Sequence, residues 1–231
     1  NGLKKPIRWF SIPQLFRYER QQRGRLREHF QLNCDLIGEA GPLGDAEIIA
    51  LAIDVMRAFG LGPTDVRVRL SDRRLVQALL TELEVSDNQV TVIFQVLDKL
   101  ARTPPDVSTK KMSDAGIAPA AIDRIISLSE IRTWDGLEDR TSSRDSTREA
   151  VRQLLVVRDA VAQMGLGEYL DFDFTIVRGL AYYTGTVLEL SDAKGELRAI
   201  CGVGRYGNLL SPTRRVDLSS LGVAVVDPGP G

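Results

Sequence analysis

Arginine side chains are concentrated near the start of the chain, in a stretch that could bind phosphate. Five arginines occur within residues 17–27, which read Arg-Tyr-Glu-Arg-Gln-Gln-Arg-Gly-Arg-Leu-Arg. A guanidinium group offers paired N–H donors in one plane, and these match phosphate oxygens better than an ammonium group does. A run of charge can also simply face water, so the arginines alone leave both interpretations open.

A row of polar side chains begins where this basic stretch ends. With the two-residue period of a β-strand, His29, Gln31, Asn33 and Asp35 share one face, and the residues between them are apolar. Such a row can be the wet side of an antiparallel sheet. Because anion donors and small polar side chains converge at this point, we favour a site for an anionic small molecule.

The two features together resemble motif 2 of class II aminoacyl-tRNA synthetases, in the form found in histidyl-tRNA synthetases. The resemblance runs from Phe16 to Gln31. It implies that Arg17 contacts the α-phosphate of ATP and that Glu19 contacts the amino group of adenine. Arg25 would approach the outer phosphates or the acceptor end of tRNA. His29 takes the place where this family commonly stacks an aromatic ring on adenine, and the resemblance gives it that role.

A second cluster lies within residues 172–185, where Arg178-Gly179 joins two strand-like runs. An arginine in such apolar surroundings is costly unless an anion pairs with it, so it forms either a structural ion pair or a ligand contact. The string resembles the first histidine-specific signature of histidyl-tRNA synthetases. By that resemblance Arg178 is a fixed cation beside the reacting α-phosphate, together with Mg²⁺, and also borders the histidine pocket. Ala181 departs from the family, because many members carry an acidic residue there.

The side chains that the resemblance assigns to the histidine substrate come from separate parts of the chain. Gln31 and Asp35 would hold its ammonium group and neighbouring atoms, and Tyr182 and Tyr183 would line the pocket. Tyr206 would help to close the pocket.

Residues 201–209 resemble the second histidine-specific signature, in which a glycine turn leads into a short helix. A glycine-rich turn is weak support by itself, since most such segments are only turns. Val203 and Gly207 depart from the usual glycine and aspartate of the signature. We expect these two departures to alter how the backbone approaches the ligand.

The hydrophobic pattern separates the elements that must position these residues. Alternation predicts strands between Ile7 and Gly38 and a further strand over Val66–Leu70, and helical spacing predicts a helix from Gly44 to Gly60. From Asp72 to about Gly167 the pattern is helical almost throughout. β-Branched and aromatic residues then return with period two, which predicts strands at 172–177, 181–190 and 197–201.

Strands on both sides of a helical region indicate one discontinuous domain with an insertion. We expect residues 1–71 and 168–231 to form the catalytic core, and residues 72–167 to form an inserted helical domain. The predicted fold class is α+β, with an antiparallel sheet of the class II synthetase type flanked by helices.

The composition bounds the class of protein. The chain has 231 residues, 43% of them hydrophobic and 26% charged, which is enough for a buried core. Its net charge of -1 argues against binding nucleic acid through bulk positive charge, so RNA contact needs a local basic patch. Cys34 and Cys201 have no partner at metal-ligand spacing, and we predict neither a protein-held metal nor a disulfide. With no membrane-spanning run and no signal segment, we expect a cytoplasmic protein.

The two ends of the sequence indicate a fragment. The chain does not begin with Met, and no segment before Ile7 is long enough for motif 1, which builds the dimer interface of class II enzymes. Leu221 to Val226 resembles the strand that opens motif 3, but the arginine of that motif and an anticodon-binding domain are missing. We therefore expect about half of a synthetase, inactive alone and homodimeric when complete.

The resemblance implies a histidyl-tRNA synthetase that uses ATP with Mg²⁺, L-histidine and tRNA(His). A non-catalytic synthetase-like regulatory subunit of histidine biosynthesis is the main alternative. Such paralogues tend to lose the basic loop of motif 2, whereas this chain keeps Arg17, Glu19, Arg23 and Arg25. A truncated, inactive synthetase is the second alternative, supported by the departures at Val203 and Gly207.

Overall fold

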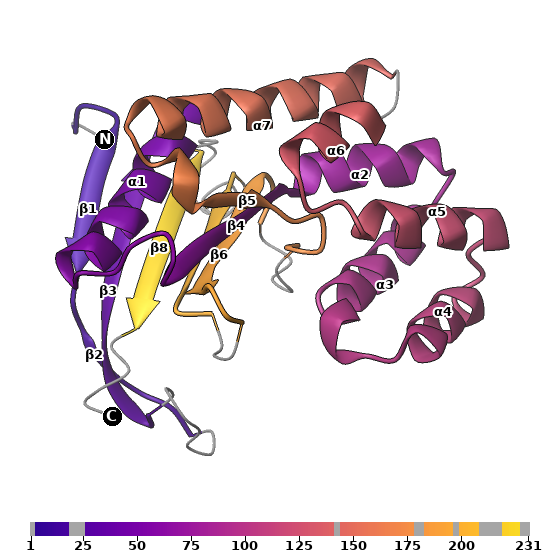
Figure 1. The fold of residues 1–231 in the computed structure, drawn as a ribbon, viewed down its shortest axis with the longest axis horizontal. Coiled ribbons are helices and arrows are strands. Elements are labelled where there is room, and N and C mark those ends of the chain that lie inside the picture. Colours follow the sequence, from indigo (N-terminus) through magenta and orange to yellow (C-terminus); the bar gives the residue numbers. More distant parts are fainter. Residues whose placement is uncertain are drawn as a thin grey trace.

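An antiparallel sheet flanked by helices forms the body of the molecule (Figure 1). The computed structural model describes residues 3–18, 26–140, 144–177, 183–195, 199–207 and 219–226. The strand order is β1-β3-β8-β7-β6-β4-β5, and β2 pairs with β3. Among the described strands β4 and β5 run parallel, and the other neighbours are antiparallel. The predicted α+β class with an antiparallel-dominated sheet is confirmed.

The strands come from both ends of the chain. Their bounds are β1 Ile7–Ser11, β2 Gln14–Phe16, β3 Glu28–Ile37, β4 Val66–Asp72, β5 Leu170–Phe172, β6 Thr186–Asp192, β7 Cys201–Tyr206 and β8 Ser220–Val226.

Helix α1 follows β3, and the other helices lie between β4 and β5 in the sequence. Their bounds are α1 Pro42–Ala58, α2 Arg73–Glu82, α3 Asp87–Leu97, α4 Pro105–Asp114, α5 Pro119–Ser129, α6 Trp134–Arg140 and α7 Asp145–Gln163, with short 3-10 turns at Leu100–Arg102 and Gly167–Tyr169.

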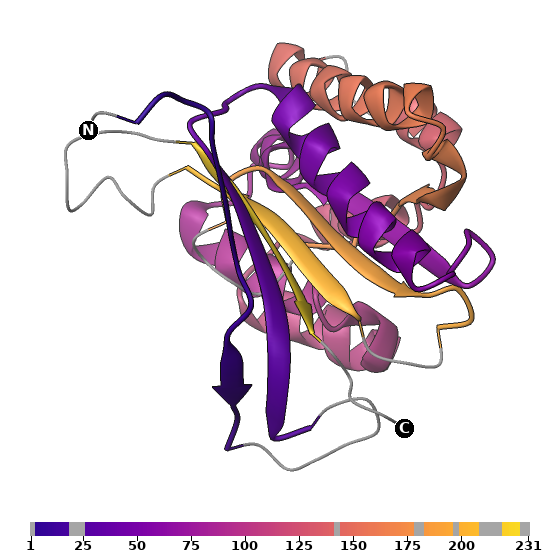
Figure 2. The same cartoon turned by 90° about the vertical axis from the view of Figure 1, so that its left-hand side faces the viewer.

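One face of the sheet, here called the covered face, packs against α1, and α7 lies over α1 (Figure 2). Proline in the first turn and Asp45 near the positive end of the helix dipole favour the start of α1. Apolar residues four apart, such as Ile49 and Ile53, then form a stripe that packs on the sheet. On β3 the alternate residues Cys34 and Leu36 complete this core. The polar row of β3 therefore points to the opposite face, here called the open face.

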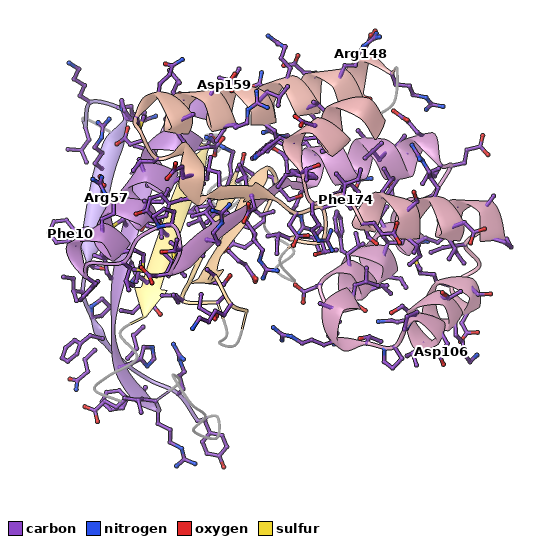
Figure 3. The ribbon with its side chains drawn as sticks, viewed as in Figure 1. Phe10, Arg57, Asp106, Arg148, Asp159 and Phe174 are labelled. Carbon is purple, nitrogen blue, oxygen red and sulfur yellow. The ribbon has the colours of Figure 1, made fainter. Side chains whose placement is uncertain are left out.

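Helices α3, α4 and α5 lie beyond the β4–β5 edge of the sheet (Figure 1). Aromatic side chains pack where the two parts meet. Phe174 is buried there (Figure 3), and the ring of Phe172 lies 5.7 Å from that of Trp134. Within the described ranges, no helix combines the length and apolar character needed to cross a membrane.

Several of the predicted local structures differ from the observed ones. The strand expected over residues 197–201 begins only at Cys201, and the strand expected over residues 181–190 is β6, which begins at Thr186. The strand expected over residues 172–177 ends at Phe172, because the Asp173 carboxylate accepts hydrogen bonds from the amide and hydroxyl of Thr175 and turns the chain. The glycine turn expected from Cys201 is strand β7, which pairs with β6 and β8. The helix expected after that turn lies outside the described residues.

Candidate functional site

A row of four paired residues, two of them glycines, crosses the open face. Asp35 of β3 pairs in register with Gly222 of β8, Gly222 pairs with Gly204 of β7, and Gly204 pairs with Val187 of β6. Residues in register point to the same face of a sheet. The two glycines therefore leave an open strip beside the Asp35 carboxylate.

The hydroxyl of Tyr206 lies in this strip and donates to Asp35 Oδ1 at 2.5 Å. Tyr206 follows Gly204 by two residues, so its side chain shares the open face with Asp35. A Cβ at Gly222 would lie 2.6 Å from Asp35 Oδ1 and 3.3 Å from the Tyr206 hydroxyl. Glycine at position 222 is thus what allows the carboxylate and the phenol to meet.

The ring of Tyr183 lies against the second glycine of the strip. A Cβ at Gly204 would stand 2.1 Å from Cε1 of Tyr183, a distance that no real contact allows. Gly207, one of the residues that depart from the family signature, donates its backbone N–H to Thr184 Oγ1 at 2.9 Å. The structure thus brings Tyr183, Tyr206 and Asp35, all predicted to bind histidine, onto one strip of the open face.

Arg17 and His29 meet near the other end of β3. Arg17 Nη2 lies 2.8 Å from His29 Nε2, and His29 is only 5% exposed. Since a guanidinium group can only donate, Nε2 accepts in this contact. The strand pairing of β2 with β3 and the backbone hydrogen bond from Arg17 to Arg27 hold Arg17 beside His29.

Strand β3 connects the Arg17 end of the site to the Asp35 end. His29 and Asp35 are six residues apart on one face, which at the rise of a strand is about 20 Å. Between them the Gln31 amide donates to Asn33 Oδ1 at 2.6 Å. One face of β3 therefore carries His29, which is predicted to bind ATP, and Gln31 and Asp35, which are predicted to bind histidine.

Four of the predicted site residues lie outside the described residues. They are Glu19, Arg25, Arg178 and Tyr182. Their roles, like the substrate roles of the described site residues, remain predictions.

A buried ion pair on the covered face was not predicted from the sequence. Arg205 donates to Asp45 Oδ1 at 3.0 Å and to the carbonyl oxygens of Glu39 and Gly41 at 2.7 and 3.0 Å. Burial raises the pKa of the Asp45 carboxyl group, and Arg205 opposes that rise. The available signal was strand alternation, which places Arg205 opposite in direction to Tyr206.

Two further features bear on ligands. The described residues contain no group of three His, Cys, Asp or Glu side chains that could hold a metal ion. A cavity of about 220 Å³ lies in the helical region, and none of the predicted site residues lines it.

Comparison with known proteins points to one family. The family model described as Histidyl-tRNA synthetase matches residues 1–226. A histidine–tRNA ligase of Opitutus terrae is 39% identical over 230 residues, which cover 98% of this chain and 53% of that protein. The chain spans about half the length of the curated relatives it matches.

Solved structures share the fold. A histidyl-tRNA synthetase of Nostoc sp. PCC 7120 superposes with a TM-score of 0.85 at 24% identity, over 97% of this chain and 53% of that one. A Bacillus halodurans protein described as an ATP phosphoribosyltransferase regulatory subunit/histidyl-tRNA synthetase gives 0.81 at 23%, over 96% and 57%. At these identities the likeness concerns the fold alone. With the family match over residues 1–226, it follows that this chain belongs to the histidyl-tRNA synthetase family.

Proposed function

We propose that the protein containing this chain is a histidine–tRNA ligase, which activates L-histidine with ATP and transfers it to tRNA(His). The observation that carries the proposal is the pairing of Asp35 with Tyr206 over Gly222, on the same face of β3 as the Arg17–His29 contact. The curated relatives named histidine–tRNA ligase support the same reaction.

The first proposed step is a displacement at phosphorus. A carboxylate oxygen of histidine forms a bond to the α-phosphorus of ATP, the bond from that phosphorus to the bridging oxygen breaks, and pyrophosphate leaves. No protein nucleophile takes part. Arg17 and Arg178 would stabilise the negative charge that develops on the phosphoryl oxygens, because fixed cations need no reorganisation during the reaction.

The second proposed step is acyl transfer. A hydroxyl oxygen of the terminal tRNA ribose loses its proton to water and forms a bond to the carbonyl carbon of histidyl-adenylate, the bond from that carbon to the phosphate oxygen breaks, and AMP leaves. Holding the reactants in contact supplies much of the rate in such reactions. The site residues would act in this step by orienting the adenylate.

The histidine end of the site is built for a cationic or N–H-bearing ligand. Asp35 is an acceptor when ionised, and the phenol of Tyr206 fixes one of its two oxygens. We assign the substrate ammonium group and neighbouring atoms to Gln31 and Asp35. Tyr182, Tyr183 and Tyr206 would enclose the amino acid.

At the nucleotide end, Arg17 would bind the α-phosphate and Glu19 the adenine amino group. Arg25 would contact the outer phosphates, and His29 would stack on adenine. Arg17 contacts a ring nitrogen of His29, which supports the proposal that the α-phosphate and the adenine bind close to this pair.

We also propose the wider organisation of the protein. Residues 1–71 and 168–231 would form the catalytic core, and residues 72–167 an inserted helical domain. The complete protein would be a cytoplasmic homodimer that uses Mg²⁺ with ATP.

Exchange of labelled pyrophosphate into ATP tests the proposal, using the protein encoded by the complete open reading frame. We expect exchange with histidine and with no other standard amino acid. Arg178→Ala should abolish exchange, a loss of about 100-fold or more, without changing the circular dichroism spectrum. Exchange with another amino acid, or unaltered exchange in the variant, would contradict the proposal. Histidine binding without exchange would instead favour a regulatory subunit.

A further inference from the structure

The main chain of Arg73 holds one end of the segment that carries the first histidine-specific signature. Arg73 is the first residue of α2 and follows β4 directly. Its backbone N–H donates to the carbonyl oxygen of Gly185 at 3.0 Å, immediately before β6 begins at Thr186. The position where the chain enters β6 is therefore fixed by the start of α2.

The side chain of Arg73 holds the other end of the same segment. Its Nη1 donates to the carbonyl oxygen of Val177 at 3.1 Å, and Val177 is fully buried. Residues 178–184, which contain Arg178, Tyr182 and Tyr183, begin directly after Val177 and end directly before Gly185. One residue thus contacts both flanks of this segment.

The same guanidinium group also contacts the helical region. Its central carbon lies 4.3 Å from the ring centroid of Phe94 on α3, which is the geometry of a cation–π contact. A planar guanidinium can stack through its face and donate through its edge at once, whereas an ammonium group cannot. Burial lowers the pKa of Arg73, in agreement with an enclosed position.

We propose that Arg73 is a positioning residue that couples helix α3 to the two chain positions Val177 and Gly185. By fixing Gly185 it keeps the nearby Tyr183 ring against Gly204 of β7. The inference rests on the proposed function for the role of Tyr183. It assigns Arg73 no contact with substrate.

Three variants of the complete protein test this coupling in histidine-dependent pyrophosphate exchange. Arg73→Met removes the edge donors and the charge, and should lower kcat about 100-fold, because small misplacements of reacting groups cost that much. KM for ATP should change less than about threefold, since Arg17 and His29 remain in place, whereas KM for histidine should rise because Tyr183 borders that substrate. Arg73→Lys should have a kcat about tenfold higher than that of Arg73→Met. Phe94→Leu should lower kcat about three- to tenfold, the value of one cation–π contact.

Arg67→Met is the matched control. Arg67 lies on β4, the strand that leads into α2, and pairs with Asp171 while donating to the carbonyl of Glu168. Among the described residues, Arg67 donates no hydrogen bond to Val177 and does not stack on Phe94. We expect its kcat to stay within about twofold of the unmodified protein. Equal losses in the Arg67 and Arg73 variants would reduce Arg73 to a purely structural role and overturn the proposal.

Amide hydrogen exchange gives a second readout that needs no activity. The amides of Ile176 and Val177 donate to Asp173 and Thr175 carbonyls at 3.0 Å, next to the carbonyl that Arg73 holds. Arg73→Met should speed exchange at these two amides at least about tenfold while leaving those of α1 unchanged. Unchanged exchange would overturn the inference. If the unmodified protein lacks histidine-dependent pyrophosphate exchange, the proposed function fails. Amide hydrogen exchange at Ile176 and Val177 still tests whether Arg73 holds this part of the chain.

Discussion

Arg205 and Tyr206 are neighbours on β7, yet they serve opposite faces of the sheet. Arg205 is 4% exposed on the covered face and donates to Asp45 and to two backbone carbonyls. Tyr206 is partly exposed on the open face and donates to Asp35. Each residue thus binds one carboxylate, one of them enclosed and the other accessible.

The two carboxylates differ in what surrounds them. Asp45 is 2% exposed, and its partner Arg205 donates to Asp45 and to backbone carbonyl oxygens within the protein. Asp35 is only partly buried, and the residue in register with it on β8 is Gly222, which adds no side chain over the sheet. An enclosed ion pair that loses one partner destabilises the fold. An accessible carboxylate costs little to remove but can bind a ligand. The comparison therefore predicts that stability depends on Asp45 and Arg205, and activity on Asp35.

Arg205→Met should produce the largest loss of stability, about 3–5 kcal/mol at neutral pH, because it leaves a buried carboxylate without its cation. Burial already raises the Asp45 pKa, and removing Arg205 should raise it further above the unfolded value of about 3.9. A carboxyl group with a raised pKa in the folded state loses its contribution as the pH rises through that pKa. The destabilisation should therefore be smaller at about pH 4.5 than at about pH 7.5, as measured by urea unfolding.

Arg8→Met is the matched control for this measurement. Arg8 pairs with Glu47 at 2.5 Å, but the two side chains are 63% and 41% exposed. Exposed ion pairs contribute little, so we expect the urea midpoint to stay unchanged. If both variants lose the same stability, enclosure is not what distinguishes the covered face.

Asp35→Asn should leave stability within about 0.5 kcal/mol and lower kcat/KM for histidine about 100-fold. The amide keeps the size of the side chain but loses the charge that a cationic ligand would contact. Pyrophosphate exchange over a range of histidine concentrations measures the effect, with ATP saturating. Asn33→Asp on the same strand is a control that adds a carboxylate next along the row, and it should not restore the activity of Asp35→Asn. An unaltered kcat/KM in Asp35→Asn would show that Asp35 on the open face does not take part in histidine recognition.

Sequence reasoning succeeded where one period dominates. The alternation from His29 to Asp35 predicted the polar face of β3, because a strand that is buried on one face must alternate. It could not predict that Arg17 would contact the ring nitrogen of His29, since that pair depends on how β2 pairs with β3.

The same reasoning failed where glycine and aspartate had two possible roles. Gly202 and Gly204 indicated a turn, but β6 and β8 supply hydrogen bonds on both sides, and glycine in β7 instead makes room for Tyr183. Asp173 lies in a run of strand-forming residues, and only its contact with Thr175 reveals the turn. The buried pair of Asp45 and Arg205 spans 160 residues, so alternation could place Arg205 on the face opposite to Tyr206 but could not identify Asp45 as its partner.

Gly204→Ala should disturb the open face alone, because it adds a single methyl group there. The new Cβ would overlap Cε1 of Tyr183, so the ring must leave the strip. We expect KM for histidine to rise about tenfold, the effect of a change of one methylene in a pocket. Gly62→Ala is the control, because its Cβ would meet Asp65 Oδ2 at an ordinary 3.6 Å. An unchanged KM for histidine in Gly204→Ala would show that Tyr183 does not contribute to histidine binding.

Cys34 and Asp35 offer the smallest test, since they are adjacent on β3 and face opposite sides. Burial, and secondly the charge of Asp35, raise the pKa of the Cys34 thiol. The folded protein should therefore label with iodoacetamide far more slowly than the unfolded chain, as measured by mass spectrometry of the peptide that contains Cys34. Asp35→Asn removes only the second cause, so labelling at a fixed pH should rise about twofold. A much larger rise would mean that the substitution opens the covered face, and that the two sides of β3 are not independent.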